Sequence, residues 1–214
     1  MSGQNLRLPV FAIDRHRLTT DGVGVTTLVG AYGCPLACRY CINPHAWNPD
    51  TLQKCKELTP KELYERVRID ELYFLATGGG ITFGGGESLL HADFIHAFRE
   101  VCGKAWHLTA ETSLQVSKEQ LLTAIEAVDS FIVDIKDMNP SIYEAYTGKT
   151  ADRMLKNLTL LSQKVSSDRV RIRVPMIPDY NTKEDCDYSV KQLKTIGFTQ
   201  IEVFPYILGK SSRM

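Results

Sequence analysis

The stretch that decides the fold is Phe131-Ile132-Val133-Asp134-Ile135, in which every residue except the aspartate is apolar. A short apolar run without alternating polar residues is typical of a strand that is buried on both faces. Such strands belong to parallel sheets whose connections are helices. The stretch therefore predicts an α/β fold, in which strands and helices alternate along the chain.

The sequence on both sides of this stretch shows the expected alternation. Ser117 and Gln120 form a capping box that opens a helix ending near Val128, and Thr59 with Glu62 forms another. Further helices are expected over residues 93–102, 154–165 and 182–196. Strands are expected over residues 23–29, 80–83, 106–111, 131–135, 170–176 and 201–204. Six strands alternating with helices predict a parallel sheet, either doubly wound or closed into an incomplete barrel.

Composition restricts the class of protein. The 214 residues suit one compact domain, and 43% hydrophobic with 23% charged residues is ordinary for a globular chain. The 25 Lys and Arg balance the 25 Asp and Glu, which disfavours a general binder of nucleic acid. No run of 18 apolar residues and no signal-peptide pattern occurs, so we expect a cytoplasmic protein without a membrane partner.

The cysteines provide the strongest chemical signal. In a reducing cytosol they favour metal or catalytic use over disulfides. Cys34, Cys38 and Cys41 follow the first expected strand with the spacing C-x3-C-x2-C. Three thiolates can hold three corners of a 4Fe–4S cluster and leave one iron open to another ligand. The alternative is a zinc site in which His45 or Cys55 is the fourth ligand.

Polar and glycine residues follow the other strands. Sites in parallel α/β folds gather at the carboxyl ends of the strands, so these residues are expected on one rim with the cysteines. They are Gly84, Gly85, Gly86, Glu87, Glu111, Thr112, Asp134, Lys136, Arg173 and Tyr206.

These motifs resemble a known family. The cysteine spacing, with Tyr40 before the last cysteine, resembles that of the radical S-adenosylmethionine (radical SAM) enzymes. Residues 78–87 are similar to the G-G-G-(I/V)-T-x-x-G-G-E stretch of pyruvate formate-lyase activating enzymes, which activate glycyl radical enzymes. Other landmarks that match are Asp21-Gly22-Val23-Gly24, Asp134-Ile135-Lys136, Phe204-Pro205-Tyr206 and Leu208-Gly209-Lys210.

The resemblance implies an α/β fold, a partial (β/α)6 TIM-like barrel of the radical SAM type, with the cluster loop after strand 1. Residues 1–214 would form a single radical SAM core domain. The closing helix after the sixth strand is missing from the sequence, so we expect either a truncated chain or a partner that covers this flank. Ile207 stands where the activating enzymes have a histidine, which suggests a different subgroup.

The resemblance also implies the site. Cys34, Cys38 and Cys41 would hold the 4Fe–4S cluster, and S-adenosylmethionine would bind its open iron. Asp134 would bind the ribose hydroxyls and Lys136 the methionine carboxylate. The glutamate-threonine step, at residues 111–112, matches a monovalent-cation site, and residue 173 would lie on the substrate side. The cofactor contacts expected from the family are Tyr40, Gly85, Gly86, Glu87, Glu111, Thr112, Asp134 and Lys136, with Arg173 on the substrate side.

The implied function is activation of a glycyl radical enzyme. The reduced cluster would cleave S-adenosylmethionine to a 5′-deoxyadenosyl radical, which would abstract a hydrogen from a glycine Cα of the partner. A flavodoxin or ferredoxin would supply the electron, and no side-chain acid or base would be needed. Two alternatives stay open: a radical enzyme acting on a small molecule or another polypeptide, and a non-catalytic zinc-binding module.

Overall fold

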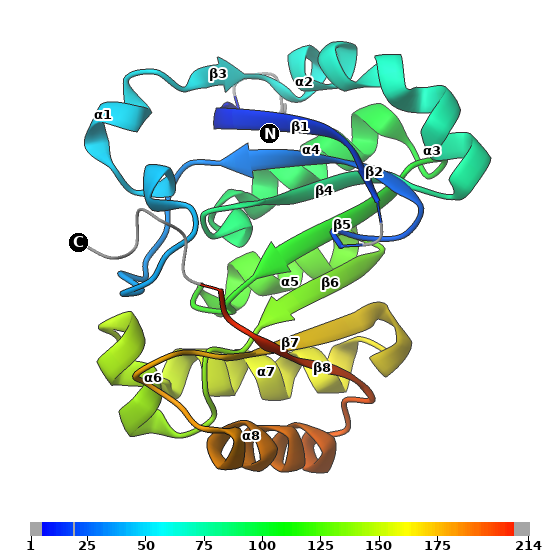
Figure 1. Ribbon diagram of the computed structural model, residues 1–214. Helices are drawn as coiled ribbons and strands as arrows, with labels where there is room; N and C mark the ends of the chain where they lie inside the picture. The colour runs from blue at the N-terminus through cyan, green and yellow to red at the C-terminus, as the bar shows by residue number, and fades with distance from the viewer. Residues whose placement is uncertain (1–5, 19, 208–214) are drawn as a thin grey trace.

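The strands of the molecule form one sheet, in the order β3-β1-β2-β4-β5-β6-β7-β8 (Figure 1). The structure is a computed structural model that describes residues 6–18 and 20–207. Its strands are β1 (Leu8–Leu18), β2 (Val25–Ala31), β3 (Lys56–Leu58), β4 (Gly80–Gly85), β5 (His107–Thr112), β6 (Ser130–Asp134), β7 (Val170–Met176) and β8 (Gln200–Pro205). The landmark Leu208-Gly209-Lys210 lies outside the described residues.

The six strands expected from the sequence are β2 and β4 to β8, and each pairs in parallel with its neighbour. The sheet has two further strands that the sequence analysis did not predict. β1 pairs antiparallel with β2, and β3 pairs antiparallel with β1. The second half of β1 is polar, and its register against β2 shifts at two places, so it lacks a clear strand pattern.

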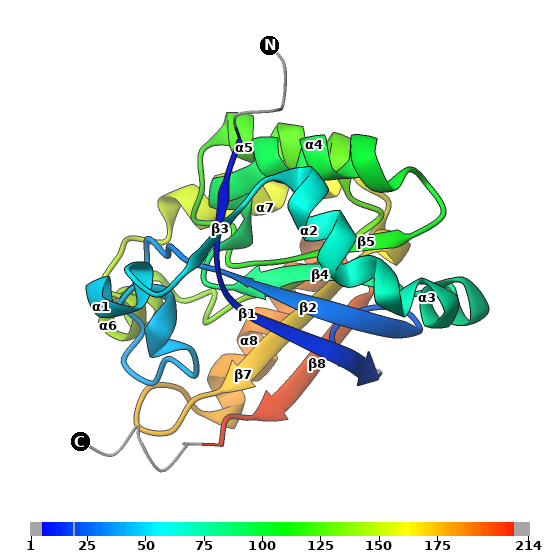
Figure 2. The same cartoon turned by 90° about the horizontal axis from the view of Figure 1, so that it is seen from above.

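Helices connect the parallel strands and pack on the outer side of the curved sheet (Figure 2). Among the described strands, β8 pairs with neither β1 nor β3, so the barrel is open. The expected partial barrel is confirmed, and the doubly wound alternative was wrong. The helices are α1 (Pro49–Leu52), α2 (Pro60–Val67), α3 (Glu71–Thr77), α4 (Ala92–Cys102), α5 (Lys118–Ala127), α6 (Pro140–Thr147), α7 (Asp152–Lys164) and α8 (Lys183–Ile196).

Local sequence explains where most of these helices begin. The expected capping boxes at Thr59 and Ser117 open α2 and α5, and Thr182 with Asp185 opens α8 in the same way. Helix α6 was not predicted. It begins at Pro140 after an Asn cap, and it lies directly against the cysteine loop, as described below.

The amino end of the barrel is filled by the Asp-Gly motif before β2. A Cβ atom on Gly22 would meet the side chains of Thr26, Thr82 and Thr109 at 3.1–3.2 Å, so only glycine fits there without displacing them. Thr82 Oγ1 donates a hydrogen bond to the Asp21 carbonyl oxygen. With this end filled, the interior of the barrel is open toward the carboxyl ends of the strands.

Candidate active site

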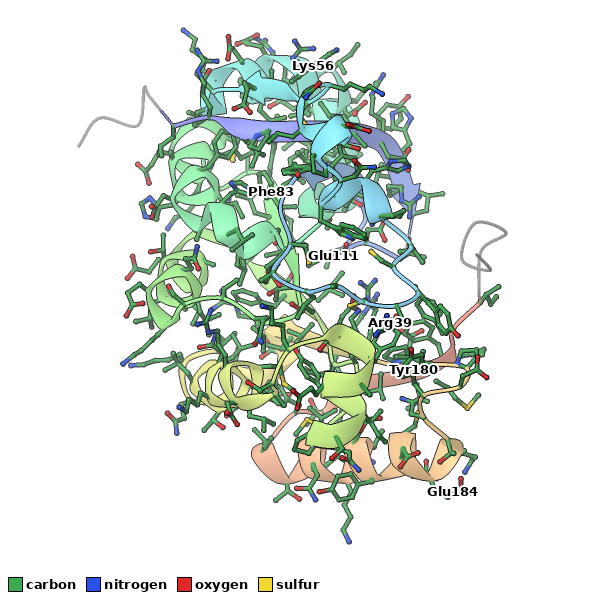
Figure 3. All side chains as sticks on the ribbon, turned by 90° about the vertical axis from the view of Figure 1, so that its left-hand side faces the viewer. Arg39, Lys56, Phe83, Glu111, Tyr180 and Glu184 are labelled. Atoms are coloured by element: carbon green, nitrogen blue, oxygen red, sulfur yellow. The ribbon has the colours of Figure 1, made fainter. Side chains whose placement is uncertain are left out.

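The three clustered cysteines lie in the loop after β2, and their side chains line one cavity of about 250 Å³. Helix α6 holds this loop from outside, because the amides of Ala37 and Arg39 donate to the carbonyl oxygens of Thr147 (3.0 Å) and Tyr146 (3.1 Å). Figure 3 looks onto the carboxyl ends of the parallel strands, and Arg39 of the loop and Glu111 are both seen from this side. The loop therefore lies over the rim on which the sequence placed the site.

The glycine motif at the end of β4 brings backbone against this loop. Gly86 donates to the Ala31 carbonyl oxygen, and a Cβ atom on it would lie 2.2 Å from the Gly33 oxygen. Gly85 has φ +94°, in the left-handed region that favours glycine. The absence of side chains at both positions lets bare backbone line the cavity beside the cysteines.

Four charged side chains from three strands and the loop after β6 meet on the opposite wall of the cavity. Arg173 lies at the centre: its Nη1 is 3.2 Å from Glu111 Oε1, and its Nε donates to Asp134 Oδ1 at 2.6 Å. Lys136 Nζ donates to the other oxygen of Asp134 at 3.2 Å. The parallel register of β6 and β7 sets Asp134 directly beside Arg173. Two cations thus neutralise two carboxylates around a cavity.

Burial and charge shift the pKa values of these groups in different directions. Burial raises the pKa of Glu111 to about 7, although Arg173 opposes the shift. Burial also disfavours the ionised form of Asp134, but Lys136 and Arg173 together hold the pKa of Asp134 below its usual range. Burial favours the neutral amine of Lys136, yet the Asp134 carboxylate raises its pKa. Burial raises the pKa of the Cys34 thiol to about 12 and that of Cys38 in the same direction.

Three residues expected on the rim or as cofactor contacts do not line the cavity, namely Gly84, Tyr40 and Glu87. Tyr40 donates its hydroxyl to Asp179 at 2.9 Å, on the exposed side of the loop. The buried Glu87 carboxylate accepts hydrogen bonds from Thr112 Oγ1 at 2.7 Å and from the amide and hydroxyl of Ser113 at 2.8 and 2.6 Å. Glu87 therefore ties the glycine turn to the end of β5, and its role toward a cofactor stays a prediction.

Every other residue expected at the site lines the cavity. The structure adds residues that sequence reasoning did not assign. Asn43 Nδ2, for example, donates to the Gly85 carbonyl oxygen at 3.1 Å. Tyr206 was expected on the rim, and its hydroxyl donates to the Tyr40 carbonyl oxygen. Asn43 lies two residues after Cys41, so its closeness to the cysteines in the sequence could have predicted its place at the site. Tyr146 could not have been predicted in this way, because it lies on helix α6, which the sequence analysis did not predict. The added lining residues are Leu36, Ile42, Asn43, Ser113, Tyr146, Pro175 and Phe204.

The donor set fits an iron–sulfur cluster better than a single zinc ion. Within the described residues, no three His, Cys, Asp or Glu side chains are gathered closely enough to hold one metal ion. A zinc ion needs all four ligands within about 2.3 Å of one point. His45 and Cys55, the alternative fourth ligands, do not line the cavity. Three thiols around one cavity match a larger cluster with one iron left open.

Comparison with known proteins agrees with this geometry. The model of the radical SAM superfamily matches residues 28–187. The chain is also 32% identical over 190 residues to a pyruvate formate-lyase-activating enzyme of Clostridium pasteurianum, and the match covers 87% of this chain and 77% of that protein. This chain belongs to the radical SAM superfamily, among its activating enzymes. Membership implies an iron–sulfur enzyme that uses a 4Fe–4S cluster and S-adenosylmethionine.

Two further similarities are found, one in sequence and one in fold alone. The (2S)-3-sulfopropanediol dehydratase activating enzyme of Klebsiella oxytoca is 26% identical over 231 residues, covering 80% of this chain and 72% of that one. The fold resembles that of SuiB from Streptococcus suis, solved with S-adenosylmethionine, with a TM-score of 0.60 and 14% identity. That match covers 85% of this chain and 40% of SuiB, so this chain spans less than half of SuiB's length. No helix in the described part of the chain is long and apolar enough to cross a membrane.

Proposed function

We propose that this chain activates a glycyl radical enzyme by abstracting a hydrogen atom from a glycine Cα of that partner. One observation carries the proposal: three thiols and a charge-balanced set of four side chains line a single cavity at the carboxyl ends of the parallel strands. The relatives named as activating enzymes support the class of partner. We further propose that residues 1–214 form one core domain.

The cluster and S-adenosylmethionine, when bound, would supply a 5′-deoxyadenosyl radical. The chain's own task is to bind, orient and exclude water. Cys34, Cys38 and Cys41 would hold the cluster, and the backbone of Gly85 and Gly86 would allow close approach of the methionine end. No residue of this chain needs to act as an acid or base for hydrogen abstraction.

The charged wall is suited to exchange its internal pairs for contacts with the cofactor. A methionine carboxylate would attract Lys136, and ribose hydroxyls would then donate to the oxygen of Asp134 that Lys136 leaves. Because Arg173 holds the other Asp134 oxygen, the carboxylate keeps a cationic partner throughout. Pairing within the chain therefore limits the cost of burying these charges before the cofactor binds.

We extend the proposal to a monovalent cation beside Glu111 and Thr112, and to a flavodoxin or ferredoxin as the electron donor. Burial of the Glu111 carboxylate supports the cation, since a nearby positive charge would offset the raised pKa of this group. Arg173 already supplies part of that charge, so we expect the affinity for potassium to be weak. Titration with potassium against tetramethylammonium, followed by S-adenosylmethionine affinity, tests this point.

The experiment is anaerobic reconstitution of the cluster, reduction with dithionite, and measurement of 5′-deoxyadenosine formed from S-adenosylmethionine. The Cys38→Ala variant should contain little cluster iron and form no product. Cys55→Ala is the matched control, because it is the same substitution at a cysteine that does not line the cavity. If the parent protein bound zinc instead of iron and formed no product, the proposed enzymatic activity would be refuted. A glycyl radical seen by electron paramagnetic resonance after adding pyruvate formate-lyase would establish the class of partner.

A further inference from the structure

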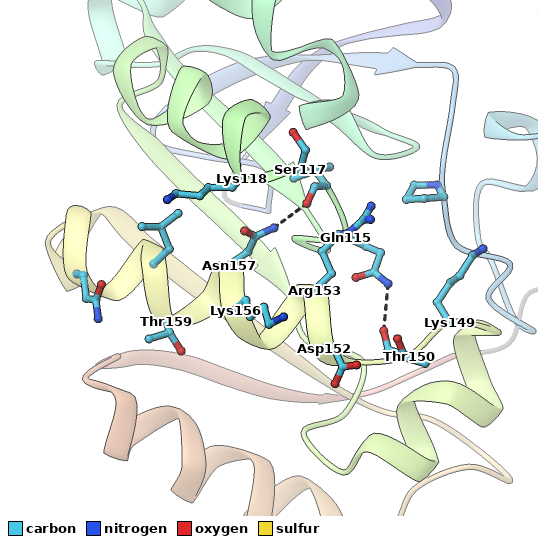
Figure 4. A pocket seen from close by; sticks show the side chains of 14 residues that line it. Gln115, Ser117, Lys118, Lys149, Thr150, Asp152, Arg153, Lys156, Asn157 and Thr159 are labelled. Carbon is cyan, nitrogen blue, oxygen red and sulfur yellow. Dashed lines mark hydrogen bonds between the residues drawn. The ribbon is translucent and has the colours of Figure 1, made fainter.

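A second cavity lies outside the barrel, between the amino end of α5, helix α7 and the loop after α6 (Figure 4). Its volume is about 820 Å³, larger than the cavity that holds the cysteines. We refer to it as the α5–α7 cleft. The proposed function uses none of the residues that line it.

The floor of the α5–α7 cleft is held by buried hydrogen bonds. Asn157 Nδ2 donates to the carbonyl oxygens of Leu114 (2.9 Å) and Val116 (2.8 Å), and Gln115 Nε2 donates to the Thr150 carbonyl oxygen at 3.1 Å. Gln115 is 6% exposed, and within the described residues its Oε1 has no hydrogen-bond partner. A buried acceptor without a donor costs free energy, so the chain's own groups do not fully satisfy this part of the floor.

The rim of the cleft is strongly basic. Four exposed cations line it, against one acid among the described lining residues, Asp152, while exposed Glu119 directly follows Lys118. Within the described part of the chain, no salt bridge engages any of the four. This local excess occurs in a chain whose formal net charge is zero. Such a patch attracts acidic partners and speeds their association. The four cations are Lys118, Lys149, Arg153 and Lys156.

A wall one chain segment thick separates the cleft from the cavity of the cysteines. Pro35 lines the cleft, while its neighbours Cys34 and Leu36 line the inner cavity. The same division occurs after β5, where Ser113 faces the inner cavity and Gln115 the cleft. The two cavities share no lining residue. A molecule bound in the cleft therefore cannot pass into the cavity of the cysteines. An electron can cross the wall, because electron transfer needs no open passage.

We propose that the α5–α7 cleft is the docking surface for an acidic one-electron carrier protein. This inference rests on the proposed function, which needs an electron at the cluster. In the step, the carrier is oxidised by one electron and the cluster is reduced by one, and no proton or atom crosses the wall. The glycyl radical enzyme does not fit this role, since its glycine has to enter the inner cavity. The two partners would use different faces of the molecule.

The test uses a bacterial flavodoxin, an acidic flavin protein, as the probe. Arg153→Glu together with Lys156→Glu reverses two charges at i, i+3 on α7. Lys191→Glu with Lys194→Glu makes the same change in charge at the same spacing on α8, and neither lysine lines the cleft. By calorimetry at low salt, the α7 pair should weaken flavodoxin binding at least about tenfold, while the α8 pair leaves it unchanged. Binding to the parent protein should weaken as salt rises.

A second readout separates this inference from the proposed function. Formation of 5′-deoxyadenosine driven by reduced flavodoxin should fall in the α7 variant, while formation driven by dithionite stays at the parent rate. Flavodoxin binding that is unchanged in the α7 variant, or weakened equally in both variants, would overturn the docking surface. So would a cleft that binds inorganic phosphate but plays no part in flavodoxin binding. Absence of product with dithionite in the parent would refute the proposed function alone.

Discussion

Buried charges lie at both ends of the barrel, but they are arranged differently. At the amino end, the Asp70 carboxylate is fully buried and accepts hydrogen bonds from Arg15 Nε at 2.8 Å and Thr27 Oγ1 at 2.8 Å, with His16 Nε2 at 3.0 Å. At the carboxyl end, Glu111 and three other charged side chains are also paired, yet they surround a cavity. Pairing alone therefore does not distinguish a structural cluster from a binding site; the cavity does.

The difference extends to the electrostatics of the two carboxyl groups. Hydrogen bonds from Arg15 hold the pKa of Asp70 below its usual range, since the donors outweigh the effect of burial. At Glu111, burial has a larger effect than the opposing charge of Arg173, and it raises the pKa to about 7. Asp70 thus holds β1 against the segment before α3. The protonation of Glu111, in contrast, can be changed by a charged ligand in the cavity. Substitutions at the two ends should have opposite consequences for folding and for ligand binding.

The largest expected effect is at the carboxyl end. Lys136→Met should weaken S-adenosylmethionine binding about 100-fold, because a charged hydrogen bond to the ligand carboxylate is lost. Thermal stability should fall by less than this binding free energy, since Arg173 still pairs with Asp134. Equilibrium dialysis with labelled S-adenosylmethionine measures the loss, and Lys183→Met, at an exposed lysine on α8, is the control. A large drop in stability with unchanged affinity would show that Lys136 is structural.

The second effect is at the amino end. Asp70→Asn should lower the free energy of unfolding by about 2 kcal/mol, because the buried carboxylate loses its charged hydrogen bonds. The loss is limited because the Arg15 side chain is 42% exposed and can turn to water. Urea unfolding measures it. Affinity of the folded protein for S-adenosylmethionine should not change, and a weakened affinity would contradict the division between the two ends.

The stability of the protein should change with pH in opposite directions for the two carboxyl groups. The folded-state pKa of Glu111 is raised from 4.5 to about 7, so stability falls as pH rises between these values. The slope from this group approaches about 1 kcal/mol per pH unit and should vanish in Glu111→Gln. The pKa of Asp70 is depressed, so its contribution is present above pH 4 and is lost as pH falls further. Urea unfolding from pH 3 to 8 checks both limbs, and a Glu111→Gln curve parallel to the parent would be inconsistent with this assignment.

The smallest effect is expected where charges are neither buried nor beside a cavity. Lys183 and Asp187 pair at 3.0 Å on α8 with both side chains exposed. Asp187→Asn should change the free energy of unfolding by less than about 0.5 kcal/mol, because water and salt screen exposed pairs. Unfolding in 0.05 and 0.5 M salt provides the measurement. A loss as large as that for Asp70→Asn would mean that burial is not what distinguishes the two pairs.

The sequence by itself determined the features that depend on neighbours along the chain. The capping boxes at Thr59 and Ser117, the buried run at residues 131–135 and the C-x3-C-x2-C spacing act over a few residues, so each was predicted. The rule that sites lie at the carboxyl ends of parallel strands then placed Glu111 and Asp134 on one rim. Local chemistry and one topological rule were sufficient for this part of the site.

Only the tertiary structure decided the features that depend on contacts between distant segments. β1 is a strand because β2 and β3 pair with it, despite its polar second half. The Glu87 carboxylate is directed toward Thr112 and Ser113 instead of the cavity, and Arg173 joins Glu111 to Asp134 across three strands. The basic cleft arises from α5, α7 and the loop after α6, which are separated along the chain. These arrangements follow from strand register and helix packing, which bring together groups that no local pattern relates.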